Sequence, residues 1–538
     1  MKPRPTSAEI VLARRGVAGH RQYRIPALAV TTQGTILAAY DGRPNLDDLP
    51  NPIDLLIRRS TDNGVTWGPQ QTVRTGTGLD GYGDPSLLVD NTTGRIFCFH
   101  AAGTHAGFFE AVEGLDREDD IQHADVSFSD DDGATWQHRR LTSMLKREGM
   151  TGLFAAAGAG IQVHTGPFKG RLVQQFVVLF QGKIVAASAY SDDHGDSWTL
   201  GEFIAGGNEN KVVCRSDGFL LLHSRATPHR LTAISTDGGR SYSPAEPHTE
   251  LPDPSDNGSL ARFDGVPSVT TLAIPETENW LIATHNHDSM LRRNTVLKLS
   301  QDDGATWPFG VVLCAGSSQY STAARLPDGR IGVLYERQGY QEIVFAALDP
   351  QELLDSPTAS LTHDGGTARA GDLSLDVVLR SITPGRPDIW ESVGESHVLA
   401  QTDGAWDPAA WKEVGQGYTE DAPQVLSNRE SQDLNYGPVI RGYKAGDVLA
   451  FSGRVANGGE STPSIAVHLS PDLGVVDPTS LAPDTSLGFT ATYTVTAQDI
   501  AAGSAIVRFI LDSADGAAQS GATKAFAFGM VSGNVTET

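Results

Sequence analysis

The chain has 538 residues, which is too long for one ordinary hydrophobic core and predicts two or more domains. Its 58 glycines and hydrophobic fraction of 39% are typical of a turn-rich, mostly β protein. The net charge of −24 argues against nucleic acid and against anionic membrane surfaces as partners. An anionic substrate would therefore need a locally basic site.

Targeting signals and cysteines narrow the setting further. No stretch approaches 18 consecutive apolar residues, so we expect no membrane insertion. The N-terminal segment MKPRPTSAEIVLARRG lacks an apolar core, so it predicts no signal peptide, and an intracellular location stays open. Cys98, Cys214 and Cys314 are too few and too far apart for a disulfide framework or a zinc site. They lie in apolar stretches such as RIFCF, which predicts buried free thiols.

Residues 1–350 consist of short apolar segments bounded by Gly, Asp and Asn, such as TILAAYDGR, GRIFCFHA and GFLLLHSR. Such segments are typical of β-strands. Between them an eight-residue pattern, Ser-x-Asp-x-Gly-x-(Thr or Ser)-(Trp or Tyr), starts at Ser60, Ser129, Ser191, Ser235 and Ser300. The copies are 69, 62, 44 and 65 residues apart. The mean spacing of about 60 residues is the size of one propeller blade.

The residue types of the repeat predict a structural turn. We expect its Asp to accept backbone N–H groups, its Gly to adopt a positive φ, and its aromatic residue to pack between neighbouring sheets. Calcium binding is the less favoured interpretation, because each copy offers too few oxygen ligands. The short sequence HNHD at residues 285–288 is interpreted as a polar loop rather than as metal ligands. We predict no metal and no cofactor.

The composition changes near residue 350, after which Thr, Ser and Ala dominate and apolar residues alternate with polar ones. This alternation predicts a β-sandwich. We therefore predict an all-β protein with a six-bladed β-propeller over residues 1–355, the sixth blade lacking the repeat. A linker at 356–370 and a C-terminal β-sandwich, Ig-like or jelly-roll-like, over 371–538 would follow. Four aromatic residues of that second part are compatible with a glycan or cell-surface contact: Trp390, Trp406, Trp411 and Tyr418.

Three arginines stand in strand-like contexts: Arg24 in QYRIP, Arg225 in HSRAT and Arg292 in MLRRN. Arginine is rarely buried without a partner. Three arginines that converge on a propeller axis would form a bidentate clamp for a carboxylate in an otherwise acidic protein.

These features resemble the bacterial exo-α-sialidases (neuraminidases). The repeats resemble that family's Asp boxes, and YRIP resembles its Phe/Tyr-Arg-Ile-Pro motif. The resemblance covers roughly residues 10–350 and extends to DGRP at Asp41–Pro44 and to the segment Gln319–Arg337. It implies hydrolysis of terminal α-linked sialic acids with retention of configuration through a tyrosyl-enzyme intermediate. The implied partners are sialylated glycoproteins, gangliosides and oligosaccharides, and the implied location is secreted or at the cell surface.

The resemblance also implies roles for individual residues. Arg24, Arg225 and Arg292 would grip the substrate carboxylate, with Arg293 as the alternative third arginine. Glu336 would orient the first arginine. Arg43 and Asp84 would line the pocket near the substrate's 4-hydroxyl and N-acyl groups.

For catalysis, the resemblance implies Tyr320 as nucleophile, Glu209 as the glutamate that activates it, and Asp48 as the acid/base, with Asp47 as the alternative. A trans-sialidase would share all of these residues. Two competing interpretations are a non-catalytic propeller that binds sialic acid and a structural Asp-box propeller that binds a protein.

Overall fold

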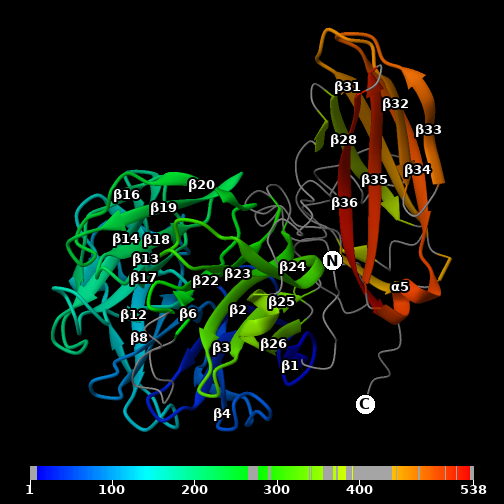
Figure 1. The fold of residues 1–538 in the computed structure, drawn as a ribbon. Helices are drawn as coiled ribbons and strands as arrows, with labels where there is room; N and C mark the ends of the chain where they lie inside the picture. The colour runs from blue at the N-terminus through cyan, green and yellow to red at the C-terminus, as the bar shows by residue number, and fades with distance from the viewer. Residues whose placement is uncertain are drawn as a thin grey trace.

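The computed structural model describes two β-rich parts of the chain (Figure 1). The described residues are 9–264, 277–288, 292–337, 340, 342–354, 368–370, 373–382, 390–391, 439–443, 445–446, 448–469, 473–502, 504–515 and 518–532. The first part is a propeller, and the second part is built from two further sheets. Within the described residues, no helix is long and apolar enough to cross a membrane.

The first three blades follow one another in chain order. Blade 1 is β2 (Gln22–Val30), β3 (Ile36–Arg43), β4 (Asp54–Ser60) and β5 (Gln71–Arg74). Blade 2 is β6 (Gly81–Val89), β7 (Ile96–Gly103), β8 (His123–Ser129) and β9 (Gln137–Arg140), and β11 (Gly158–Ala159) pairs with β6 in parallel. Blade 3 is β10 (Met150–Ala155), β13 (Leu172–Phe180) and β14 (Lys183–Ser191), with β12 (Ile161–Gln162), β15 (Thr199–Leu200) and β16 (Ile204–Ala205) as short partners. A 3-10 turn at Glu118–Asp120 and the short helix α1 (Thr142–Leu145) connect these strands.

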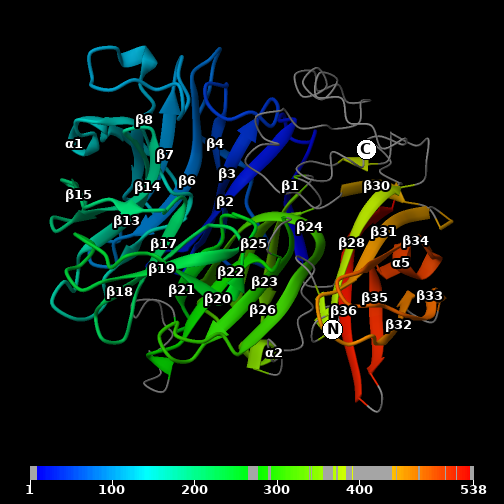
Figure 2. The ribbon, with the colours of Figure 1, turned by 90° about the horizontal axis from the view of Figure 1, so that it is seen from above.

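The last three blades complete the ring (Figure 2). Blade 4 is β17 (Asn210–Cys214), β18 (Leu220–Ser224), β19 (His229–Ser235) and β20 (Glu246–Pro252). Blade 5 is β21 (Ser259–Arg262), β22 (Leu281–Asn286), β23 (Arg293–Ser300) and the first half of the long strand β24 (Phe309–Arg325). Blade 6 is the second half of β24, β25 (Ile331–Arg337), β26 (Glu342–Leu348) and the N-terminal strand β1 (Glu9–Arg14).

Two pairings close the propeller. β1 pairs antiparallel with β26, so the start of the chain supplies the last strand of blade 6. β24 pairs with β23 up to Ser317 and with β25 from Ser318, so one strand passes from blade 5 to blade 6. As a result β2 of blade 1 lies beside β24 of blade 6 at the centre of the ring. The predicted propeller of six blades is confirmed within the described residues.

The repeat occupies the same place in five blades, at the end of the third strand. In each copy the Ser hydroxyl accepts the N–H of the Gly, as at Ser60 and Gly64, where the distance is 2.9 Å. The Asp accepts both the N–H and the hydroxyl of the residue four positions later, as Asp62 does from Thr66. The five glycines have φ between 80° and 90°. The predicted turn chemistry is therefore confirmed, and blade 6, whose third strand β26 is followed by α2 (Pro350–Leu354), has no copy.

The aromatic residue that ends each copy packs between blades, as predicted. Trp67 of blade 1 meets Phe345 of blade 6 edge to face, with ring centres 5.0 Å apart. Trp198 of blade 3 contacts Phe99 of blade 2 in the same way at 5.0 Å. Trp307 of blade 5 is fully buried in the cluster between blades 4 and 5. The repeat therefore joins neighbouring blades as well as turning the chain.

The second part forms a β-sandwich, as predicted. One sheet is β27 (Ala368–Ala370), β28 (Leu373–Ile382), β31 (Val448–Asn457) and β34 (Ser486–Thr494). The other is β29 (Trp390–Glu391), β30 (Val439–Tyr443), β36 (Ala518–Ser532), β35 (Ser504–Asp515), β32 (Ser464–Leu469) and β33 (Leu473–Ser480), with helix α5 (Ala497–Ala502) at its end. One core with Phe451, Val467 and Phe509 joins both sheets.

The structure also bears on several smaller predictions. The last three residues of the predicted linker, 368–370, form strand β27. Trp406, Trp411 and Tyr418 lie outside the described residues. Cys98, Cys214 and Cys314 are buried free thiols, as predicted. The interpretation of residues 285–288 as a polar loop is wrong in part, because His285 and Asn286 lie on the fully buried strand β22.

The Asp-box carboxylates make the propeller sensitive to acid. Hydrogen bonds from Thr66 and from Thr135 lower the pKa of Asp62 and of Asp131, respectively, to about 2. Because these pKa values lie below the unfolded value of about 4, the bonds stabilise the fold above pH 4, and this stabilisation is lost as the pH falls through 2. We predict that Asp131→Asn narrows the difference in Tm between pH 7 and pH 3, measured by calorimetry. The control Asp116→Asn, at an exposed loop position, should leave that difference unchanged, and an equal effect of both variants would contradict the prediction.

Candidate active site

A cavity of about 180 Å³ lies where the innermost strands of the propeller meet. Its polar wall includes Arg24 from β2, Asp84 from β6, Glu209 immediately before β17, and Tyr320 from β24. Its apolar wall is formed by Leu49, Phe108, Phe109, Phe154, Val177 and Ile184. A half-apolar cavity with few converging charged groups is the typical form of a small-molecule site.

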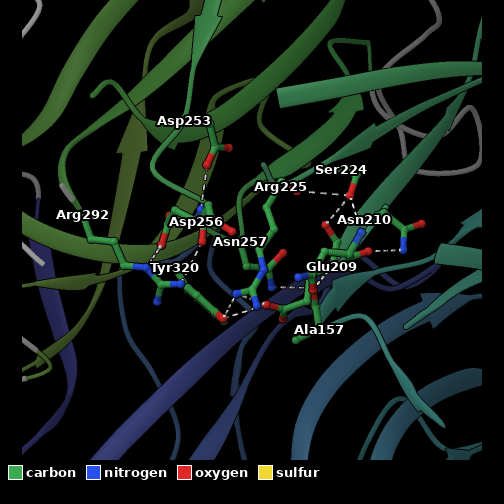
Figure 3. Close-up of polar contacts among 12 residues, drawn as sticks. Ala157, Glu209, Asn210, Ser224, Arg225, Asp253, Asp256, Asn257, Arg292 and Tyr320 are labelled. Carbon is green, nitrogen blue, oxygen red and sulfur yellow. Dashed lines mark hydrogen bonds and ion pairs between the residues drawn. The ribbon is translucent and has the colours of Figure 1, made fainter. Parts of the chain in front are cut away.

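The hydroxyl group of Tyr320 is the centre of a buried hydrogen-bond network (Figure 3). It donates to Oε2 of Glu209 at 2.6 Å and accepts from Nη1 of Arg225 at 2.6 Å. The same Arg225 nitrogen is 2.5 Å from Oε2 of Glu209. Burial raises the pKa of the Tyr320 phenol above its ordinary value, and Arg225 opposes that shift. The phenol therefore has a carboxylate acceptor for its proton and a cation beside its oxygen.

Arg24 is held by Glu336 of β25. Its Nε lies 3.3 Å from Oε1 of Glu336, and both side chains are almost completely buried. The Arg24 guanidinium also lies over the rings of Tyr340, at 4.1 Å, and Tyr320, at 5.3 Å. Burial raises the pKa of Glu336, and the charge of Arg24 opposes the rise. The structure thus brings Glu336 to the first arginine.

Glu336 also holds two backbone segments. Its Oε1 accepts the N–H of Ile25 at 2.7 Å, and its Oε2 accepts the N–H of Tyr320 at 3.2 Å. Both N–H groups lie where a β-ladder is interrupted: β2 and β3 shift register between Arg24 and Ala27, and β24 and β25 shift between Ser318 and Ser321. Ile25 has φ of +61°, which is rare for a β-branched residue and marks a strained position. Bulges of this kind re-aim side chains beside active sites.

Arg292 occupies a different position from the other two arginines. It is fully buried and does not line the cavity. Its Nη2 donates to the carbonyl of Ser255 at 2.8 Å, and its Nε lies 3.5 Å from Oδ1 of Asp256. Its guanidinium lies 5.0 Å from the centre of the Tyr320 ring. All three arginines therefore surround Tyr320, but only Arg24 and Arg225 reach the cavity wall. The side chain of Arg293 lies outside the described residues.

Arg43 connects two aspartates, Asp41 and Asp48. Its Nη2 contacts Oδ2 of Asp41 at 2.7 Å, and its Nη1 contacts Oδ1 of Asp48 at 2.8 Å. Asp48 lines the cavity with a side chain that is 61% exposed, whereas Arg43 is buried behind it. Asp47, the alternative to Asp48, does not line the cavity, and its carbonyl accepts from Arg43 at 3.3 Å.

Asp84 lines the cavity next to this group. Its N–H donates to Oδ1 of Asp41 at 3.1 Å, at a register shift of β6 where Asp84 has φ of +61°. Burial raises the pKa of Asp41 to about 6 and the pKa of Asp84 well above its usual range, while Arg43 opposes both shifts. Strongly shifted carboxylates in a cleft are typical of functional sites.

Sequence reasoning missed several residues of the site. Asp41 belongs to the DGRP segment, but its part in holding Arg43 and Asp84 requires the β3–β6 contact. Asp256 was missed because the sequence does not show that it faces Arg292. The apolar wall from Phe108 and Phe109 was missed because the segment AGFFEAV carries no periodic signal.

Comparison with known proteins places this geometry in a family. A family model described as BNR repeat-like domain matches residues 34–333. A sialidase of Micromonospora viridifaciens is 44% identical over 343 residues, which is 62% of this chain and 52% of the relative. A sialidase of Bacteroides fragilis is 28% identical over 336 residues, covering 58% of this chain and 60% of the relative. The chain thus spans about half to three fifths of the length of these relatives.

Solved structures agree with the sequence comparisons. The structure of a microbial sialidase, Hz136, matches with a TM-score of 0.57 and 26% identity, covering 64% of this chain and 69% of that one. The fold and its axial arginine-lined cavity define a BNR-type propeller. The chain belongs to the sialidase family of these BNR repeat-like propellers.

Glu336 can be tested by a change that keeps its shape. Glu336→Gln removes the charge that faces the buried Arg24 and leaves one of the two backbone N–H groups facing another donor. We predict a loss of about 3–5 kcal/mol in the free energy of unfolding, measured in urea, since one partner of a buried ion pair is removed. The control Asp328→Asn, in a more exposed pair with Arg330, should cost less than about 1 kcal/mol. Equal costs in both variants would contradict the assigned role of Glu336.

Proposed function

We propose that this protein is an exo-α-sialidase, a glycoside hydrolase that releases terminal α-linked sialic acids with retention of configuration. The observation that carries the proposal is the Tyr320 hydroxyl, which is bonded to both Glu209 and Arg225 inside a cavity that Arg24 also lines. The two relatives support it, since both are named sialidase. Sialylated glycoproteins, gangliosides and oligosaccharides are the proposed substrates, reached outside the cell.

The arginines suit the carboxylate that sialic acid bears on its anomeric carbon. Arg24 and Arg225 present guanidinium groups at the cavity wall, where planar N–H donors pair bidentately with a carboxylate. Arg292 lies behind Ser255, which itself lines the cavity. In the proposed complex Arg292 supports Tyr320 and contributes positive charge from behind the wall.

A tyrosine nucleophile fits this substrate better than a carboxylate. A carboxylate would have to approach the anomeric carbon against the negative charge of the neighbouring substrate carboxylate, which is costly where water is excluded. Most glycosidases use two carboxylates, and sialidases are an exception because their nucleophile is a tyrosine. Because burial raises the pKa of Tyr320, a free phenolate is disfavoured, and the proton passes to Glu209 as the oxygen attacks.

The two proposed steps conserve atoms and protons. The Tyr320 oxygen forms a bond to the anomeric carbon while the glycosidic C–O bond breaks, and the Asp48 carboxyl gives its proton to the leaving oxygen. Water then attacks the same carbon, Asp48 takes a proton from it, and Tyr320 leaves and regains its proton from Glu209. Two inversions at one carbon give net retention. Substrate in the cavity would cover the exposed Asp48 side chain and exclude water from it.

The nucleophile assignment can be tested directly. We predict that Tyr320→Phe lowers kcat for an aryl α-sialoside by at least about 100-fold, because the attacking oxygen is gone, while the fold is retained. Proton NMR of the wild-type reaction should show the α-anomer of free sialic acid as the first product. Initial formation of the β-anomer, or turnover by Tyr320→Phe at the wild-type rate, would refute the two-step mechanism.

The acid/base assignment separates two neighbouring aspartates. We predict that Asp48→Ala lowers kcat/KM for sialyllactose, whose leaving group needs a proton, by at least about 100-fold. Asp47→Ala is the matched control, and it should retain most activity because the Asp47 side chain does not line the cavity. The reverse ranking of the two variants would transfer the role to Asp47.

Product analysis with excess lactose distinguishes hydrolysis from sialyl transfer.

A further inference from the structure

Lys211 is a buried lysine next to the proposed catalytic pair. It lies on β17, two residues after Glu209, and only 2% of it is exposed. Its Nζ donates to Oδ1 of Asn257 at 2.7 Å and to the carbonyl of Asn210 at 3.3 Å. Gly158, with φ of +122°, makes room for it, since a Cβ there would lie 2.7 Å from Cε of Lys211. Burying an ammonium group costs free energy even when its donors are bonded, so the presence of a lysine at this buried position requires an explanation.

Asn257, the partner of Lys211, is connected to Tyr320 through both its side chain and its backbone (Figure 3). Its Nδ2 donates to the carbonyl of Ala157 at 3.1 Å, and Ala157 packs against Tyr320 in a small apolar cluster. Its backbone carbonyl accepts the N–H of Ser321, the residue after Tyr320, at 3.1 Å. The Lys211–Asn257 bond therefore links the strand that follows Glu209 to the strand that carries Tyr320.

The Lys211 ammonium group has a different type of partner from the nearby arginines. Arg24, Arg225, Arg43 and Arg292 each lie within 3.5 Å of a carboxylate oxygen. The hydrogen bonds of Lys211 go to amide oxygens, which accept them without cancelling its charge. Burial lowers the pKa of Lys211 to about 7; Glu209 opposes the shift, Arg230 and Arg225 add to it, and Asp256 opposes it. Lys211 thus interacts favourably with the Glu209 charge from inside the protein.

We infer that Lys211 and Asn257 are positioning residues, which hold Tyr320 against Glu209, the group that accepts the phenol proton in the proposed reaction. This inference rests on the proposed sialidase function and extends it to two residues that do not line the cavity. Lys211 acts from beneath the site, through a hydrogen bond to Asn257 and through its charge.

Lys211→Met tests the inference, because methionine replaces the unbranched aliphatic stem of lysine and removes both the charge and the donor. The expected result is a fall in kcat for an aryl α-sialoside of about 10- to 100-fold, as for a small misplacement of reacting groups. The Kd of a non-hydrolysable thioglycoside of sialic acid, which resembles the bound substrate, should change less than about 3-fold, since groups used only in the transition state affect kcat and not ground-state binding.

The pH profile provides a readout that a structural role would not move. Lys211 interacts with Glu209, Arg230, Arg225 and Asp256, and burial lowers its pKa to about 7. The ammonium group therefore loses a proton and its charge as the pH rises through 7, so this step should contribute to the basic limb of kcat/KM in wild type and be absent in Lys211→Met. A wild-type kcat together with an unchanged basic limb would overturn the inference.

Two further variants protect the test from folding artefacts. Lys298→Met is the matched control: Lys298 is also a buried lysine, its Nζ donates to the carbonyl of Glu250 at 2.5 Å, and it does not line the cavity. It should keep wild-type kcat and pH profile. The double variant Lys211→Met/Asn257→Leu removes both partners of the Lys211–Asn257 bond, so neither side chain is left with an unmatched donor or acceptor, and only the carbonyls of Ala157 and Asn210 lose a donor. It should fold and show the same loss of kcat, and normal kcat in this variant overturns the inference.

The outcome for the wild type separates this inference from the proposed function. If wild type lacks sialidase activity, the proposed function fails and Lys211 has no reaction to assist. If wild type is active and Tyr320→Phe is not, but Lys211→Met equals Lys298→Met in kcat and pH profile, only the inference about Lys211 and Asn257 fails.

Discussion

One buried carboxylate, that of Glu336, holds together the part of the propeller where the two ends of the ring meet. One oxygen binds the N–H of Ile25 and lies beside Arg24, and the other binds the N–H of Tyr320. Ile25 is 311 residues from Glu336, so these bonds join blade 1 to blade 6 and form only where the two ends of the ring lie side by side. The position of the first arginine relative to the tyrosine is thus a property of the closed propeller and not of either segment alone.

A similar arrangement occurs a second time between blades 1 and 2. Asp41, on the second strand of blade 1, accepts the N–H of Asp84 from the bulged innermost strand of blade 2. At both places a carboxylate on a second strand replaces a ladder bond that an innermost strand has lost. An orphaned buried N–H costs about 1–3 kcal/mol, and a carboxylate acceptor avoids that cost while it also pairs with an arginine. The bulges aim Arg24 and Asp84 toward the axis, and the carboxylates make the bulges tolerable.

What could be predicted from the sequence follows from the range of the interactions involved. The Asp-box turn lies within eight residues, so its bonds from Asp62 to Thr66 and its positive-φ glycines follow from local residue types. Arg24, Arg225 and Tyr320 are far apart in the sequence, and nothing in the sequence itself shows that the propeller brings them together. They could be assigned to one site only from the spacing of motifs that resemble those of a known family. Lys211 and Asn257 carry no such motif, and their pairing depends on blades 4 and 5 meeting. Arg292 shows the limit of spacing: it lies beside Tyr320, but behind the cavity wall.

The charge of the protein explains why its axial cations need such support. A chain with a net charge of −24 repels an anionic ligand unless its negative groups are distant or neutralised. The box carboxylates are bonded within turns at the outer ends of the third strands, and charges beyond about 8 Å are largely screened at physiological ionic strength. Near the axis, Glu336, Glu209, Asp41 and Asp256 each face an arginine and largely cancel it. A lysine that is bonded to amide oxygens adds positive charge without adding a carboxylate, and Lys211 carries that charge two residues along β17 from Glu209.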